Sequence, residues 1–181
     1  GRYEQAGTLL KKIIRQQPDN YTARLNLAVV HMKMNAFHEA HIILSDLYDE
    51  QPYNTDVLIN LGITRIGLGE TAAGLDLLNQ AELRGFKKPF ELYFHKGIAL
   101  SALERFDQAK LAYGKAEAID PTHEDLLFNT ALLFDRQKEY ATAVEYYERY
   151  LKQTVRFKKT DNRQKVVNRV RVLNSYLASS N

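Results

Sequence analysis

Apolar residues recur along this chain at the spacing of amphipathic helices, in segments separated by short breaks of polar residues, glycine or proline. Within residues 21–34, for example, Leu25, Ala28 and Met32 lie three or four positions apart, as residues on one face of an α-helix do. A second apolar face of the same kind begins at Phe37. No segment alternates polar and apolar residues as a half-buried strand would. The pattern predicts ten helices: eight in antiparallel pairs, one at the start of the chain and one at its end.

A longer period is superimposed on this pattern. Five small residues follow one another at intervals of 34, 34, 35 and 34 positions: Ala6, Ala40, Gly74, Ala109 and Ala143. A repeat of this length is one pair of helices, which cannot bury its apolar face alone and therefore stacks on the next pair. The small residues mark where the second helix of each pair presses against the first, because only a small side chain lets two backbones approach. The sequence thus predicts an all-α stacked array.

The expected boundaries follow from this period. We expect the second helix of a truncated leading repeat, four complete repeats and a basic capping helix, over residues 1–20, 21–54, 55–89, 90–123, 124–157 and 158–181. The second complete repeat has one extra residue and is the most irregular. Its Gly74 lies inside a helix, at a cost of roughly 1 kcal/mol relative to alanine. Its Thr71 stands where the other complete repeats have an aromatic residue.

The repeat over 90–123 carries a specific pattern, with the residues Tyr93, Gly97, Leu100, Phe106, Ala109, Tyr113, Ala116 and Pro121. This pattern resembles the signature of a tetratricopeptide repeat. The other repeats match it less completely, and together they cover nearly the whole chain. The resemblance implies a right-handed superhelical α-solenoid of antiparallel helix pairs. Because the chain begins within a repeat, we interpret it as a fragment with about four and a half repeats plus the capping helix.

In this family the first helices of successive repeats line the concave face, where partners bind. Carried over position by position, the resemblance places fourteen residues there: Leu25, Val29, Met32, Ile59, Ile63, Ile66, Phe94, Ile98, Phe128, Leu132, Asp56, Asn60, Glu91 and Asp125. An apolar strip, Val29–Ile63–Ile98–Leu132, forms the floor. The leading hypothesis is a non-enzymatic adaptor that binds a helical or extended apolar segment of a protein partner. As an alternative, Leu25, Ile59, Phe94 and Phe128 pack between adjacent first helices and are core residues.

The resemblance also argues against one kind of partner. Family members that hold the terminal carboxylate of a chaperone tail use lysine, arginine and asparagine from their first helices. At the corresponding positions this chain has Leu25, Val29, Asn60, Glu91 and His95. Of the family's residues at these positions, only the asparagine at position 60 is retained. A glutamate would repel a carboxylate. We therefore do not expect a chaperone-tail receptor.

Charge is concentrated near the end of the chain. The net charge is +3, but the segment 156–171 alone carries +6, from the basic residues Arg156, Lys158, Lys159, Arg163, Lys165, Arg169 and Arg171 against one acid. The favoured interpretation is a solubilising cap, with apolar residues covering the last repeat and basic residues facing water. The alternative is a surface for an acidic partner. Few aromatic residues lie between the basic ones, which argues against nucleic acid.

Catalytic and metal-binding chemistry is not indicated. The chain has no cysteine, and its apolar runs fall far short of the ~20 residues that cross a bilayer. The segment 38–41 reads His-Glu-Ala-His, one residue short of the zinc-protease motif, and no third ligand is evident. We therefore expect no enzyme active site, cofactor or metal within this chain. Cytoplasmic and periplasmic locations are equally compatible with the composition.

The sequence is compatible with two other functions. The first helix, Tyr3–Gln16, lacks its own partner helix, so an apolar edge is open there and the chain can serve as an assembly module that associates with itself. A bacterial envelope or secretion machinery is one such setting. Alternatively, the array selects substrates for a larger enzyme. Contact with a membrane would require a segment outside this chain.

Overall fold

The computed structural model describes residues 1–85, 87–156 and 161–179, without the side chains of residues 156 and 161. Over these ranges the chain forms ten α-helices, one short 3-10 helix and no strand, as the periodicity predicts. The elements are α1 (Arg2–Gln16), α2 (Tyr21–Lys33), α3 (Phe37–Glu50), α4 (Thr55–Gly67), α5 (Thr71–Arg84), α6 (Pro89–Ala102), α7 (Phe106–Glu117), α8 (Glu124–Arg136), α9 (Tyr140–Gln153), η1 (Thr154–Arg156) and α10 (Asp161–Ser179). None of the helices in the described ranges is both long and apolar enough to span a membrane.

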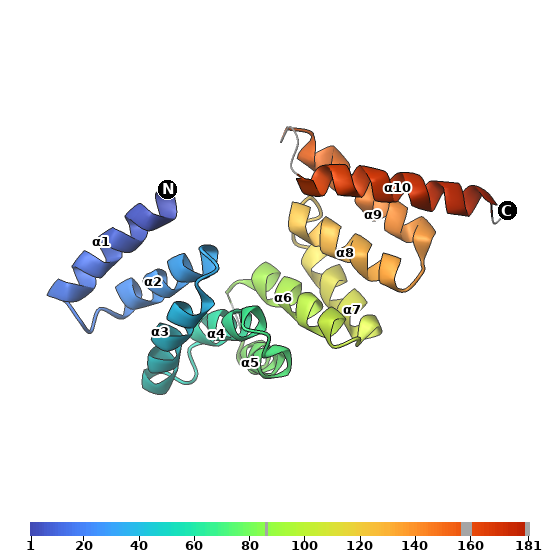
Figure 1. Ribbon diagram of the computed structural model, residues 1–181. Helices are drawn as coiled ribbons and strands as arrows, with labels where there is room; N and C mark the ends of the chain where they lie inside the picture. Colours follow the sequence, from blue (N-terminus) through green and yellow to red (C-terminus); the bar gives the residue numbers. More distant parts are fainter. Residues whose placement is uncertain (86, 157–160, 180–181) are drawn as a thin grey trace.

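The helices stack in sequence order into a curved array, with α1 at one end and α10 at the other (Figure 1). Each complete repeat is a pair: α2 with α3, α4 with α5, α6 with α7, and α8 with α9. The first helices also contact one another across repeats, α2 with α4, α4 with α6, and α6 with α8. The second helices make their main contacts only with their neighbours in sequence. First helices therefore line the inner side of the curve, and second helices lie on its outer side.

The turn between the two helices of each repeat ends in the same backbone conformation. A residue with positive φ follows the first helix in all four repeats: Asn35 (57°), Gly69 (85°), Glu104 (59°) and Lys138 (63°). Such a residue closes a helix because its left-handed conformation turns the chain away from the helix axis. The next helix of the pair can then return antiparallel. Turn geometry thus recurs with the 34- or 35-residue period of the sequence.

Close approach between paired helices depends on the small residues that mark the repeat. Ala40, Ala109 and Ala143 are all 0% exposed. In the second repeat the contact is tighter, because Gly62 of α4 faces Gly74 of α5. A Cβ added to Gly74 would lie 2.6 Å from the carbonyl oxygen of Gly62. The two glycines therefore allow the backbones of α4 and α5 to touch.

Helix α10 covers the apolar end of the last repeat. Its Val166 and Leu173 are 3% and 2% exposed and pack in one cluster with residues of α8 and α9. Arg169 on the same helix donates two hydrogen bonds to Asp135 of α8, with nitrogen–oxygen distances of 2.8 and 2.6 Å. Asp135 also accepts one from the Tyr147 hydroxyl at 3.1 Å. These contacts support the interpretation of α10 as a cap.

The basic residues of this region have different environments. Arg169 is bound to Asp135, Arg163 is half-buried, and Lys165 and Arg171 are exposed. Lys158 and Lys159 lie outside the described residues, as does the side chain of Arg156. On the described part of α10, Lys165 and Arg171 are therefore exposed, and Arg169 is held by an acid.

Candidate functional site: the inner groove

A cavity of about 360 Å³ opens on the inner side of the curve, between α2, α4 and α6. Its lining combines apolar and polar side chains: Val29, Met32, Lys33, Asn35, Phe37, Ile59, Asn60, Ile63, Lys88, Glu91 and His95. Six of these belong to the fourteen residues that the sequence places in the groove: Val29, Met32, Ile59, Asn60, Ile63 and Glu91. The helices α2, α4 and α6 are the first helices of three successive repeats, and they bring these six residues together because each helix presents the same face to the cavity.

The other predicted residues lie outside this cavity. Phe94 is 8% exposed and stacks with Phe90, with ring centroids 5.7 Å apart. Phe128 packs on Tyr150 in the core of the last repeat, at 5.4 Å between centroids. Ile66 packs against α5, where its Cγ1 would meet a Cβ on Gly74 at 2.7 Å. These side chains pack between helices.

The predicted apolar strip is divided along its length. Val29 and Ile63 line the cavity, whereas Ile98 is half-buried beside the core of the third repeat and Leu132 is 37% exposed on α8. Leu25 is half-buried. Among the predicted acids, Asp125 is exposed, and Asp56 forms an ion pair with Lys88 at 3.5 Å. The cavity is therefore confined to the first three repeats.

Three lining residues come from outside the first helices of the repeats. Asn35 is the positive-φ residue of the first turn, and Phe37 begins α3. Lys88 immediately precedes α6, in the loop that holds the extra residue of the second repeat. The extra residue in that loop is visible in the sequence, and it is the feature from which a different path of the loop could have been expected.

Asn60 is the most buried polar residue that lines the groove. It is 9% exposed, lies on α4 and lines the cavity. Within the described residues its side-chain amide makes no hydrogen bond. Its amide atoms are not among the buried unpaired atoms of the described residues, so they are accessible in the cavity, where a ligand that offers both a donor and an acceptor can pair with them.

The charges around the cavity nearly balance. Lys33 is exposed at one side, Lys88 is paired with Asp56, and Glu91 is exposed. Burial, and then electrostatic interactions with Lys33 and His123, lower the pKa of His95 to about 4. His95 is therefore neutral at physiological pH. A strongly charged ligand gains little here, because opposite charges line the same cavity.

Comparison with known proteins connects this arrangement to a family. Two family models, both described as Tetratricopeptide repeat, match residues 1–47 and 94–154. Among curated proteins, the chain is 30% identical over 139 residues to the protein O-mannosyl-transferase TMTC1 of Mus musculus, a match that covers 75% of this chain and 15% of TMTC1. The chain spans less than a fifth of the length of the curated relatives that it matches.

Solved structures share the fold over almost the whole chain. TTC0263, described as a thermophilic TPR protein of Thermus thermophilus, is similar with a TM-score of 0.74 and 19% identity, over 96% of this chain and 91% of that one. PilW, described as a widely conserved type IV pilus biogenesis factor, has a TM-score of 0.77 and 18% identity, over 98% of this chain and 84% of that one. With the 34-residue period, the paired helices and both family models in agreement, the chain is a tetratricopeptide repeat protein.

Proposed function

We propose that this chain is a protein-binding adaptor whose inner groove holds an extended, largely apolar segment of a partner. Tetratricopeptide repeats are scaffolds for protein–protein interaction, and a cavity on the inner side of the curve suits that role. Val29, Met32 and Ile63 offer apolar contacts. The balanced charges favour a segment without a strong net charge.

The observation that carries this proposal is the open amide of Asn60. A helical ligand satisfies its backbone groups internally, whereas an extended segment presents free N–H and C=O groups. An asparagine amide can pair with both at once, since it has a donor and an acceptor side by side. Asn60 therefore favours the extended form of the two ligand forms that the sequence leaves open.

The first prediction tests the groove directly. Peptides selected from a displayed library for binding to this chain should lose affinity at least about tenfold in Asn60→Ala, because a buried hydrogen-bonding group is removed. Ile63→Asp should abolish binding, because it places a charge against the apolar wall. Affinities can be measured by fluorescence anisotropy, and circular dichroism checks that both variants remain helical.

Ile42→Asp is the matched control for this experiment. Ile42 is 64% exposed on α3 and does not line the groove, so the same change in charge there should leave binding unaltered. Selected peptides that bind Ile63→Asp as tightly as the parent chain would refute a role for the groove.

A second candidate function, self-assembly, is favoured by the face of α1. In the complete repeats the marker alanines are fully buried by the first helix of the same repeat, whereas Ala6 is half-buried and Tyr3 is 49% exposed. The corresponding face of α1 is thus uncovered by any other described helix. In a purified sample, a second copy of the chain is available to cover this face of α1.

The second prediction concerns this association. The mass measured by light scattering should rise with protein concentration, and Tyr3→Asp should suppress the rise by charging the open face. Ile42→Asp should not suppress it, since Ile42 lies on α3. A monomer at every concentration up to the millimolar range would exclude self-assembly through α1.

Relatives suggest two settings in which such an adaptor works. PilW is described as a type IV pilus biogenesis factor, and TMTC1 as a protein O-mannosyl-transferase. The first corresponds to assembly within a bacterial envelope, and the second to an array that selects substrates beside an enzyme. In both settings the groove is the element that this chain would contribute.

A further inference from the structure

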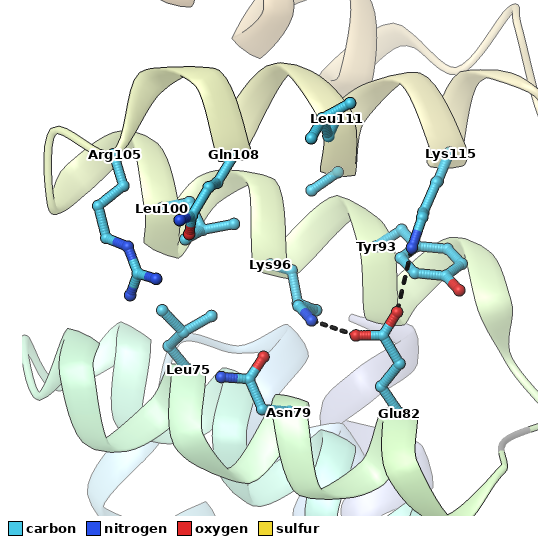
Figure 2. A pocket seen from close by; sticks show the side chains of 11 residues that line it. Leu75, Asn79, Glu82, Tyr93, Lys96, Leu100, Arg105, Gln108, Leu111 and Lys115 are labelled. Atoms are coloured by element: carbon cyan, nitrogen blue, oxygen red, sulfur yellow. Dashed lines mark hydrogen bonds and ion pairs between the residues drawn. The ribbon is translucent and has the colours of Figure 1, made fainter.

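A second pocket lies on the outer side of the array, formed by α5, α6 and α7. Its volume is about 150 Å³, and none of its lining residues belongs to the inner groove. Figure 2 shows side chains from all three helices pointing into it. The apolar side chains Leu75, Leu100 and Leu111 form part of its wall. This pocket is therefore separate from the proposed peptide groove.

Positive charge exceeds negative charge in this pocket. Glu82 accepts hydrogen bonds from both Lys96 and Lys115, the latter at 3.2 Å (Figure 2). Arg105 also lines the pocket and, within the described residues, its guanidinium has neither a hydrogen bond nor an ion pair. Burial raises the pKa of Glu82, but the hydrogen bonds from the two lysines outweigh it and lower that pKa overall. One ionised carboxylate thus binds two lysines, and Arg105 lies at the opposite end of the pocket (Figure 2).

The repeat itself identifies Lys96 as an exceptional residue. The corresponding residues of the other complete repeats are Leu27, Leu61 and Thr130, which are 6%, 2% and 5% exposed. Lys96 occupies this core position with its side chain only 13% exposed. Burying a lysine is unfavourable unless its charge is compensated, and its one acid is shared with Lys115. Packing of the helix pair does not require a charge here, since three repeats form without one.

We propose that this outer pocket binds an acidic side chain of a protein partner. A carboxylate entering between Lys96 and Arg105 would offset the excess positive charge, and charge-assisted hydrogen bonds are the strong ones. The volume fits one such side chain and falls below the roughly 300–1,000 Å³ of pockets for whole small-molecule ligands. Leu111, 70% exposed at the wall, offers contact to an apolar residue beside the acid.

A blocked tripeptide, acetyl-Leu-Glu-Leu-amide, tests this proposal, because its one charge is the side-chain carboxylate. Titrated into the isotope-labelled chain, it should shift the backbone amide NMR signals of Lys96, Arg105 and Lys115 in a saturable way. The same tripeptide with glutamine should bind at least about tenfold more weakly, since a charge-assisted hydrogen bond is lost. Equal binding of the two tripeptides would overturn the proposal.

The repeat supplies the variant that separates binding from folding. Lys96→Leu inserts the residue found at the corresponding positions of two other repeats, so the fold should persist while affinity for the glutamate tripeptide falls at least about tenfold. Lys110→Gln removes the same charge from α7 outside the pocket and should leave affinity unchanged. Unchanged affinity in Lys96→Leu would refute the site.

Two further measurements establish the chemistry and the place of binding. Inorganic phosphate should compete only weakly with the glutamate tripeptide. If phosphate displaced the tripeptide at a concentration below the dissociation constant of the tripeptide, the pocket would be assigned to free anions and the proposal overturned. The groove variant Ile63→Asp should bind the tripeptide normally. Loss of tripeptide binding in that variant would place the peptide in the inner groove and contradict an outer site.

Discussion

We expect Gly74→Ala to lower the free energy of unfolding by about 2 kcal/mol, although alanine is the better helix former. The new Cβ would lie 2.6 Å from the backbone oxygen of Gly62 and 2.7 Å from Cγ1 of Ile66. Backbone atoms of a packed helix cannot give way singly, so α4 and α5 must separate. Overpacking costs about 1–3 kcal/mol, and a clash with backbone atoms lies at the upper end, so a cost of about 3 kcal/mol outweighs the gain of roughly 1 kcal/mol in helix propensity. Denaturant unfolding followed by circular dichroism measures the difference.

Gly114→Ala is the matched control in the same array. Gly114 lies within α7, and a Cβ there would meet no atom within 4 Å. Only the propensity difference applies, so this variant should be more stable than the parent by about 0.5–1 kcal/mol. The opposite signs of the two substitutions are the result to look for. A Gly74→Ala variant as stable as Gly114→Ala would contradict the close approach of α4 and α5.

The second large effect is expected at the capping helix. Leu173→Ala should destabilise the end of the array by about 3 kcal/mol, the usual cost of a cavity in a packed core. Leu173 is 2% exposed and belongs to one cluster with Tyr147, Tyr150 and Val166. Because each repeat contacts only its neighbours, the loss should be local. Hydrogen exchange should accelerate in α8, α9 and α10 and change little in α2 and α3.

Val172→Ala provides the comparison on the same helix. Val172 precedes Leu173 but is 56% exposed, so its truncation should change stability by less than about 0.5 kcal/mol. If exchange in α8 and α9 were equally slow in both variants, α10 would not be acting as a cap. The comparison separates burial from any effect of altering α10 itself.

Much of the fold was predictable because its signals are local. Apolar spacing marks the helices, and the marker series from Ala6 to Ala143 sets the length of the repeat. The structure confirms ten helices in the described ranges, the pairing of those in the complete repeats, and the burial of Ala40, Ala109 and Ala143. Local signals suffice here because a solenoid is built from contacts between elements adjacent in sequence.

The candidate site was only partly predictable. The resemblance to tetratricopeptide repeats placed Val29 and Ile63 in the groove, and both line the cavity. Ile98 and Leu132 occupy the same register but do not line it, since the cavity closes at α6. Lys88 reaches it from a loop, and loop paths do not follow helical periodicity. Register tells which face a residue occupies, and the curvature of the array decides whether that face meets others.

By itself, the sequence determined the all-α class, the repeat and the face that each apolar residue presents. Only the tertiary structure decided what two exceptional residues mean. Gly74 reads as a weak point of a helix, yet it lies against Gly62 and allows a close helix contact. Lys96 stands in the sequence where two other repeats have leucine, and the structure places its side chain beside Glu82. A period specifies spacing along a helix, whereas the distance between two helices depends on the side chains that meet there.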